Sequence, residues 1–421
     1  MIEAEYLVET PLDPEKVAGI IAGEQSSGTF VRVSGETDEL RQRAAARLLS
    51  VREIKPTPAP SLTSAWLEAK AVGGPYRRAK IRVAFPVDNI GANLPTLAAT
   101  VCGNLYDLGE VTGLRLLDLG LPAAYRDRFA HPVAGIEGTR QRAGVLDRPF
   151  FGTIIKPNVG LRSGEIATLV GDLCEAGVDF VKDDEVAADP AYAPISERVP
   201  AVMSRVRDYR QRTGRDVLVA FNITDEIDAM RRHADLVERE GGSCVMASMN
   251  WVGLAGLQTL RASTPLILHG HRNGYGALHR HPALGISAAA YQTLYRLAGV
   301  DHMHVHGIGG KFADADEDVA EAARLCAKPL AHDGEANDQV LPVFSSGQWA
   351  GTLPVTCQAA GSADFMFLAG GGILAHPMGP AAGVASLRQA WDAITEGNTL
   401  EAHARTHPAL AQSLAFYGAL A

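Results

Sequence analysis

From about residue 150 onward, strand-like and helix-like segments alternate along the chain and are joined by short turns. Helical patterns such as 165–176 and 288–298 separate the strand candidates. Eight strand–helix units in succession predict an α/β fold of the (β/α)₈ TIM-barrel type, which needs about 250 residues. The eight strand candidates open near Phe150, Val178, Asp216, Ser243, Leu266, His302, Val340 and Asp364.

The 421 residues therefore leave room for a second, smaller domain. We expect an α+β domain over 1–130, followed by the barrel domain over 131–421, with a last helical stretch over 400–420 outside the barrel. The apolar pattern of the first domain predicts helices over 14–22 and 38–49, strands over 28–33 and 79–85, and a loop around Pro56, Pro58 and Pro60.

The composition and the N-terminal sequence indicate a cytoplasmic protein. The net charge of −9 argues against nucleic acid or an anionic membrane as the main partner, so an anionic substrate would need a local basic site. The five cysteines are scattered and form no CxxC pair, which argues against a disulfide framework and a thiolate zinc site. We see no signal peptide and no apolar run long enough to cross a bilayer.

Polar or glycine residues follow nearly every predicted barrel strand. Barrel enzymes place their chemistry at these C-terminal strand ends. We therefore expect the following side chains and loops to meet at one mouth of the barrel: Lys156, Lys182 to Glu185, Asn222, His271 and Arg272, His304 and Lys311, Ser346 and Gly347, and Gly371 and Gly372.

The second strand ends in one lysine and three acids, Lys182, Asp183, Asp184 and Glu185. Lys182 and Asp184 are two residues apart, so they point to the same side of an extended strand. Oxygen ligands of this kind suit a hard cation such as Mg²⁺. The alternative is a solvated acidic loop with a surface salt bridge.

Histidines alternate on the sixth strand, so His302, His304 and His306 should share one face. A zinc site of the amidohydrolase kind would explain them, but its His-x-His pair belongs on the first strand, where this chain has none. Histidines that hold substrate oxygens and a phosphate are the better interpretation. Arg272 adds a permanent positive charge for a phosphate or carboxylate.

Two lysines are candidates for acid–base chemistry. Lys156 ends a hydrophobic strand, and Lys311 follows two glycines on a loop that could close over a ligand. An ion pair across the barrel and a solvated surface lysine are the respective alternatives. The glycine-rich ends of the last two strands predict a phosphate site, with simple tight turns as the alternative.

These strand ends resemble those of the large subunit of ribulose bisphosphate carboxylase/oxygenase (RuBisCO) over nearly the whole chain. The segments 152–157 (GTIIKP) and 177–185 (GVDFVKDDE) resemble that family's first lysine motif and its metal motif. The resemblance implies that CO₂ carbamylates Lys182 to N6-carboxylysine, which then binds Mg²⁺ together with Asp184 and Glu185.

The resemblance also implies roles for other residues and a homodimer whose active site is shared between subunits. The catalytic residues would be Lys156, Lys311 and His271. The substrate and phosphate contacts would be Arg272, His304, Ser346, Gly347, Gly371 and Gly372, together with Thr29 and Asn104 from the first domain of the partner subunit.

Several positions depart from the carboxylating members of that family. Asn158 stands where they have a second lysine, and further departures are Phe30, Ile154, Tyr275 and Gln348. These departures argue against carboxylation of a bisphosphate. The chain is thus similar to RuBisCO-like proteins, also called type IV.

Within that group, the segments 269–276 and 280–282 resemble the non-photosynthetic branch of isoapionate catabolism. This resemblance implies a Mg²⁺-dependent carboxy-lyase that decarboxylates 3-oxo-isoapionate 4-phosphate through an enediolate. Three alternatives remain: a transcarboxylase/hydrolase of the same substrate, an enolase or isomerase of a methylthioribulose phosphate, and a non-enzymatic, stress-related role.

Overall fold

The computed structural model describes residues 1–28, 33–330 and 338–420, which fall into two compact units. The first unit contains Met1–Ala130 and Gly274–Ala298. The second contains His131–Asn273, Gly299–Pro329 and the chain over 338–420. A domain boundary at residue 130 stays a prediction.

The first unit is built on a mixed five-stranded sheet with the strand order β10-β4-β1-β3-β2. β10 pairs with β4 in parallel, and the other neighbours are antiparallel. Its strands are β1 (Ile2–Thr10), β2 (Arg47–Thr57), β3 (Tyr76–Phe85), β4 (Gly113–Gly120) and β10 (Leu284–Ile286). Its helices are α1 (Pro14–Glu24), α2 (Asp38–Ala44), α3 (Ala65–Ala69), α4 (Val87–Ile90), α5 (Leu94–Cys102), η1 (Asn104–Asp107), α6 (Ala123–Arg126), α12 (Tyr275–His279) and α13 (Ala288–Leu297).

Two expectations for this unit were wrong in part. The helix predicted over 38–49 ends at Ala44, because the chain turns extended at Ala45 and β2 begins at Arg47. The ladder between β2 and β3 thus overrides the local helical pattern. Pro56 lies in β2 instead of a loop, and the ladder is irregular between Ile54 and Thr57, where a proline has no N–H to donate. The strand predicted over 28–33 falls largely outside the described residues.

The second unit contains a closed barrel of parallel strands, which confirms the predicted fold class. The strands run in the order β11-β12-β13-β5-β6-β7-β8-β9. All eight lie within two residues of their predicted starts. Their bounds are β5 (Phe150–Ile154), β6 (Phe180–Lys182), β7 (Leu218–Asn222), β8 (Cys244–Ser248), β9 (Ile267–His271), β11 (His302–His306), β12 (Leu341–Phe344) and β13 (Met366–Leu368).

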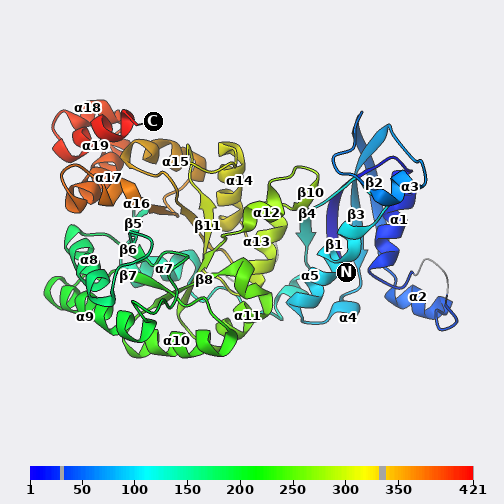
Figure 1. Cartoon of the computed structure of the whole chain (residues 1–421), viewed down its shortest axis with the longest axis horizontal. Helices are drawn as coiled ribbons and strands as arrows, with labels where there is room; N and C mark the ends of the chain where they lie inside the picture. Colours follow the sequence, from blue (N-terminus) through cyan, green and yellow to red (C-terminus); the bar gives the residue numbers. More distant parts are fainter. Residues whose placement is uncertain (29–32, 331–337, 421) are drawn as a thin grey trace. The chain divides into compact units, whose positions relative to one another are not determined.

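Helices cover the outside of the barrel, and Figure 1 shows α8 to α11 around its strands. The C-terminal stretch predicted as helical forms two helices, with Pro408 opening the second. The helices of this unit are α7 (Gly135–Ala143), α8 (Ser163–Ala176), α9 (Ile195–Thr213), α10 (Ile227–Arg239), α11 (Met249–Ser263), α14 (Asp316–Ala327), η2 (Ala350–Thr352), α15 (Leu353–Ala360), α16 (Gly370–Leu374), α17 (Pro380–Thr395), α18 (Leu400–Ala404) and α19 (Pro408–Gly418).

The barrel interior is filled by alternate residues of its strands, as the two-residue period of a strand requires. Phe150, Phe180 and Met246 belong to this buried cluster. The interior is not wholly apolar, because the rings of His269 and His302 lie 5.1 and 6.0 Å from the ring of Phe180. Buried histidines therefore lie beside apolar side chains inside the barrel.

β10 has no counterpart among the strands predicted from the sequence. This three-residue strand lies between the fifth and sixth barrel strands in sequence, yet it joins the sheet of the first unit beside β4. Tyr106 supports the pairing, because its hydroxyl donates to the carbonyl of Gly285 at 2.7 Å. A strand of three residues is too short to show a two-residue hydrophobic period in the sequence. It is recognised as a strand only through its pairing with β4.

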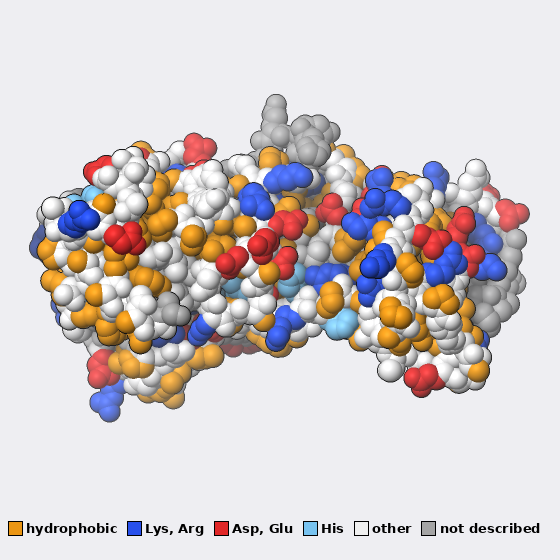
Figure 2. All heavy atoms as spheres, turned by 90° about the horizontal axis from the view of Figure 1, so that it is seen from above, with side chains coloured by type: hydrophobic (Ala, Val, Ile, Leu, Met, Phe, Trp, Pro, Cys, Tyr) orange, Lys and Arg blue, Asp and Glu red, His pale blue; other side chains and the backbone are white. Residues whose placement is uncertain are grey.

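No helix within the described ranges combines the length and the apolar character needed to cross a membrane. On the face drawn in Figure 2, acidic and basic side chains are interspersed with hydrophobic ones.

Replacing Gly285 by Ala should destabilise the first unit by at least about 2 kcal/mol. Gly285 has a φ of +99°, and a Cβ would lie 1.9 Å from the carbonyl oxygen of Leu278. The matched control is Gly19→Ala in α1, where a Cβ meets nothing within 4 Å; it should stabilise by about 0.5 to 1 kcal/mol. Urea unfolding midpoints measure both, and equal midpoints would contradict the account.

Candidate active site

The end of β6 places one lysine and three carboxylates at the barrel mouth. α8 ends at Gly177, whose left-handed φ of 83° turns the chain into the strand. Phe180 points into the barrel interior, and Lys182, two residues on, follows on the same side and is 1% exposed. On the other side of the strand, Asp179 holds Arg148 through two hydrogen bonds of 2.6 and 2.7 Å.

The two aspartates after Lys182 engage different partners. Asp183 pairs with Arg198 of α9 at 3.2 Å and accepts the backbone N–H of Asn222 at 2.9 Å. Asp184 accepts a hydrogen bond from the Nζ of Lys156 at 2.7 Å. Asp183 thus connects the end of β6 to α9 and β7. Asp184 instead contacts Lys156, which follows β5.

Lys156 is held in place by two acceptors. Besides Asp184, its Nζ donates to the Oδ1 of Asn158 at 2.9 Å. Asn158 is one of the positions that depart from the sequences of carboxylating RuBisCO proteins, and here it orients Lys156. The Lys156 side chain remains 36% exposed, so a ligand in the barrel mouth can contact its ammonium group while Asp184 also holds it.

The amine of Lys182 is buried and lies near acids. Its Nζ donates to the carbonyl oxygen of Asp183 at 2.7 Å and lies 3.8 Å from the Oε2 of Glu185. Burial lowers the pKa of Lys182, while the nearby carboxylates, Glu185 foremost, oppose that shift. Burial therefore favours the neutral amine, which is the form that reacts with CO₂.

His271 at the end of β9 joins the same cluster. Its Nε2 lies 3.6 Å from the Oε2 of Glu185, and its Nδ1 accepts the backbone N–H of Asn273 at 3.2 Å. Burial lowers the pKa of His271 to about 3. The ring is therefore neutral near pH 7, and its contact with Glu185 is not an ion pair.

The third histidine of β11 does not share the face of the other two, so that part of the expectation was wrong. His306 has a φ of 73°, and the ladder with β12 shifts register between His304 and His306. Its Nδ1 lies 2.8 Å from Asp314, which also pairs with Arg272 at 3.2 Å. Asp314 was not among the predicted site residues. It lies three residues after Lys311 and connects that segment to Arg272, which follows β9.

His302 and His304 do face the interior, where they meet His269 of β9. The Nε2 of His304 lies 2.8 Å from the Nε2 of His269, and its Nδ1 lies 3.0 Å from the Oγ of Ser345. His304 is 3% exposed. Because the protein engages both of its ring nitrogens, a direct role in substrate binding stays a prediction.

The loop that leads to Lys311 is tied to the loop after β12. The buried side chain of Gln348 donates from Nε2 to the carbonyl of Ile308 at 3.2 Å. Gly307 is needed for this approach, because a Cβ there would lie 2.1 Å from that Nε2. Gln348 was noted only as a departure from the family pattern, and the structure shows it holding the exposed Lys311 loop.

The predicted phosphate loops pack against each other. Ser346 and Gly347 both have left-handed φ values, 78° and 70°. Gly371 and Gly372 belong to the short helix α16, and a Cβ on Gly372 would lie 2.5 Å from the carbonyl oxygen of Gln348. Tyr417 of α19 donates to the carbonyl of Gly371 at 2.7 Å and supports this end of the barrel.

Two predicted contacts belong to the other unit. Asn104 is an exposed residue of η1. Thr29 lies outside the described residues. Both remain predictions.

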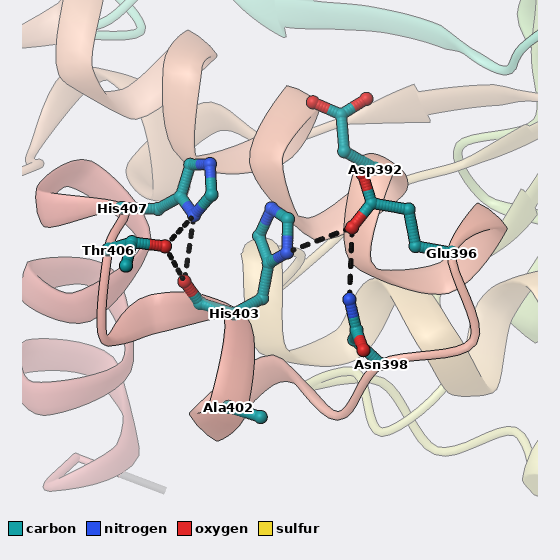
Figure 3. A pocket seen from close by; sticks show the side chains of 7 residues that line it. All are labelled: Asp392, Glu396, Asn398, Ala402, His403, Thr406 and His407. Atoms are coloured by element: carbon teal, nitrogen blue, oxygen red, sulfur yellow. Dashed lines mark hydrogen bonds and ion pairs between the residues drawn. The ribbon is translucent and has the colours of Figure 1, made fainter.

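A separate pocket of about 320 Å³ is formed by residues from α17 to the start of α19 (Figure 3). The rings of His403 and His407 stack in it at 3.8 Å between centroids, and His403 lies 3.5 Å from Glu396. No predicted site residue lines this pocket. Its remaining lining residues are Asp392, Asn398, Ala402 and Thr406.

Two family models cover most of the sequence. The catalytic domain of the ribulose bisphosphate carboxylase large chain matches residues 135–417, and the N-terminal domain of the same chain matches residues 4–125. The chain belongs to the RuBisCO large-chain family. Its barrel and preceding sheet unit have the corresponding fold.

Among the relatives of this RuBisCO family member, a 3-oxo-isoapionate-4-phosphate transcarboxylase/hydrolase of Xanthobacter autotrophicus is 47% identical over 99% of both chains. A 3-oxo-isoapionate-4-phosphate decarboxylase of Rhizobium rhizogenes is 43% identical over 97% of both chains. The crystal structure of a rubisco-like protein from Burkholderia fungorum is 61% identical, covers 99% of both chains and has a TM-score of 0.93.

The histidines of the barrel predict an acid-sensitive stability. Burial lowers the pKa of His302 to about 3. Burial also lowers the pKa values of His269 and His304 well below the usual range of a histidine. Between about pH 6.5 and the folded pKa, the unfolded state binds more protons, so stability falls as pH falls. The loss between about pH 7 and pH 5.5 should be about 1 kcal/mol per histidine.

His302→Gln should reduce that pH-dependent loss by about 1 kcal/mol, measured as the difference between urea unfolding free energies at the two pH values. His281→Gln removes an exposed histidine and serves as the control, which should leave the difference unchanged. An unchanged difference in His302→Gln would contradict a neutral, buried ring.

Proposed function

We propose that this chain is a cytoplasmic, Mg²⁺-dependent carboxy-lyase that decarboxylates 3-oxo-isoapionate 4-phosphate through an enediolate. The observation behind the proposal is the cluster of Lys156, Lys182, Asp184 and Glu185 at the barrel mouth. It occurs in a chain that shares 43% identity with a protein named for this activity. The cluster supplies both an oxygen-rich cation site and a lysine acid, and this reaction needs both.

The residues at the end of β6 fit a magnesium ion once Lys182 is carbamylated. A carbamate turns the buried amine into an anionic oxygen donor, beside the carboxylates of Asp184 and Glu185. The Nζ of Lys182 lies 3.8 Å from the Oε2 of Glu185, so a carbamate on Lys182 would lie beside that carboxylate. When bound, Mg²⁺ supplies a Lewis acid that stabilises negative charge on the substrate ketone oxygen.

The reaction also needs a proton donor, and the two lysines are the candidates. A β-keto acid needs no base to lose CO₂, because the departing carboxylate leaves its electron pair in the enediolate. A proton must then return to carbon. Lys156 is our candidate donor, because Asp184 and Asn158 hold its ammonium group beside the proposed metal ligands. Lys311, on its tethered loop, is the second candidate.

Substrate binding in this proposal uses the strand ends around the cluster. His271 ends β9 and lies 3.6 Å from the proposed metal ligand Glu185, and Arg272 follows it in the chain. The paired loops at Ser346–Gly347 and Gly371–Gly372 are the proposed phosphate site. The proposal includes a homodimer in which Thr29 and Asn104 of one subunit complete the site of the other.

A second candidate is the transcarboxylase/hydrolase reaction on the same substrate. One observation favours it: the Xanthobacter protein named for that activity is 47% identical to this chain. The same metal cluster could serve both reactions, which diverge after CO₂ is released.

Product analysis separates the candidates. Purified protein is mixed with Mg²⁺, bicarbonate and 3-oxo-isoapionate 4-phosphate and followed by carbon NMR. We expect a tetrulose phosphate plus CO₂. Phosphoglycerate plus glycolate would instead establish the transcarboxylase/hydrolase, and an unchanged substrate would refute both. Lys182→Met, which keeps the buried apolar stem, should abolish turnover without unfolding the protein.

A further inference from the structure

The pocket between α17 and α19 contains a buried histidine nitrogen with no hydrogen-bond partner among the described residues. His403 is 8% exposed, and the unpartnered atom is its Nε2. Figure 3 shows the ring of His403 between the ring of His407 and the carboxylate of Glu396. A buried polar atom without a partner costs free energy. This nitrogen is therefore suited to bind a ligand that enters the pocket.

Glu396 determines which nitrogen of His403 carries the hydrogen. The Nδ1 of His403 lies 3.5 Å from the Oε2 of Glu396. The same oxygen accepts a hydrogen bond from the side-chain amide of Asn398 at 2.9 Å, which holds the carboxylate in place. An ionised carboxylate only accepts, so Nδ1 carries the hydrogen and the Nε2 of the neutral ring has a bare lone pair. Metal-binding histidines commonly have this arrangement, with the other ring nitrogen donating to a carboxylate.

The second histidine of the pocket has the same polarity. The Nδ1 of His407 lies 2.8 Å from the carbonyl oxygen of His403, and a carbonyl can only accept. Nδ1 of His407 therefore carries the hydrogen, and the Nε2 of its neutral ring is bare. The centroids of the two rings are 3.8 Å apart. Two imidazoles with bare Nε2 atoms are thus stacked in one pocket.

The charges around the pocket favour a cation. α17 has Asp392 in its last turn and Glu396 as its C-cap, and the last turn contains no basic residue. The C-terminal end of a helix carries a partial negative charge, which adds to that of the two carboxylates. Asp392 lines the pocket together with both histidines. A cation in the pocket would therefore lie near anionic oxygens as well as imidazole nitrogens.

We propose that this pocket binds a divalent transition-metal ion such as Zn²⁺ or Cu²⁺ through the Nε2 atoms of His403 and His407. Imidazole nitrogen suits these metals, whereas Mg²⁺ prefers oxygen ligands. The site is therefore distinct from the magnesium site proposed at the barrel mouth. The ring planes are 7° from parallel, so both lone pairs meet at one ion only when the partly buried His407 ring tilts. The ion joins α18 to the start of α19.

Electron paramagnetic resonance with Cu²⁺ detects the nitrogen ligands directly. The protein is first saturated with Mg²⁺ and bicarbonate, and one equivalent of Cu²⁺ should then give a spectrum split by two nitrogens. His403→Gln and His407→Gln should each remove one nitrogen coupling. Each should also weaken Cu²⁺ binding by at least about tenfold, since losing even an outer-shell partner has that effect.

His281→Gln removes an exposed histidine of the other unit and should keep both couplings. The side chain of His407 is only partly buried, so its variant tests the proposal even if His403→Gln does not fold. A wild-type spectrum without nitrogen coupling, or an unchanged spectrum in His407→Gln, would overturn the proposal.

A competing group of metal-ligating side chains lies on other elements of the same unit. Asp189, Asp225 and His233 have ligand atoms that all lie within 4.8 Å of one another. His233→Gln is therefore a second control, and it should leave the Cu²⁺ spectrum and affinity unchanged. Loss of a nitrogen coupling in His233→Gln would place the ion at that group and refute the proposal.

Amide hydrogen exchange with Zn²⁺ locates the ion without relying on copper. An ion that binds only the closed segment slows its opening in proportion to occupancy. At about one hundred times the Kd of Zn²⁺, exchange over residues 400–418 should slow by up to about a hundredfold. Exchange in α10, which carries His233, should not change. Equal rates over residues 400–418 with and without Zn²⁺ would contradict the proposal.

Discussion

The burial of the Lys182 amine at the end of β6 is the constraint on which the rest of the site depends. An ammonium group in this position is costly unless carboxylates surround it, and Asp183, Asp184 and Glu185 follow it directly. Asp183 is paired with Arg198, so the proposed cation ligands are Asp184, which lies 2.7 Å from the Nζ of Lys156, and Glu185. The same burial favours the neutral amine that CO₂ can modify. One strand end thus combines the features from which the proposed metal site is built.

The neighbouring strand ends extend this centre through pairwise contacts. Asp184 reaches Lys156, and Glu185 lies near His271. Arg272 beside His271 is joined through Asp314 to the chain beyond Lys311, and Gln348 holds the loop before that lysine. The two candidate acids therefore differ in their surroundings. Lys156 is hydrogen-bonded to the proposed metal ligand Asp184. Lys311 is an exposed side chain on a loop whose Ile308 carbonyl accepts a hydrogen bond from Gln348.

Much of the barrel could be predicted from the sequence, because buried parallel strands are short apolar runs that end in polar residues. Lys156, Lys182 and His271 stood out for that reason. The missing parts depend on contacts between distant segments. Nothing local marks Asp314 as the partner of Arg272, Gln348 as a loop tether or β10 as a strand of the other unit. His306 leaves the expected face because its backbone turns left-handed, a state that a period-two pattern does not reveal.

Carbon-13 NMR of the protein with Mg²⁺ and ¹³C-labelled bicarbonate tests directly whether CO₂ carbamylates Lys182. If the buried amine of Lys182 becomes a metal ligand, the wild-type protein should show one carbamate carbon resonance that Mg²⁺ stabilises. Lys182→Met should lack it, whereas Lys311→Met, which removes an exposed lysine, should keep it. A wild-type spectrum without a carbamate resonance, or one that persists in Lys182→Met, would contradict the account.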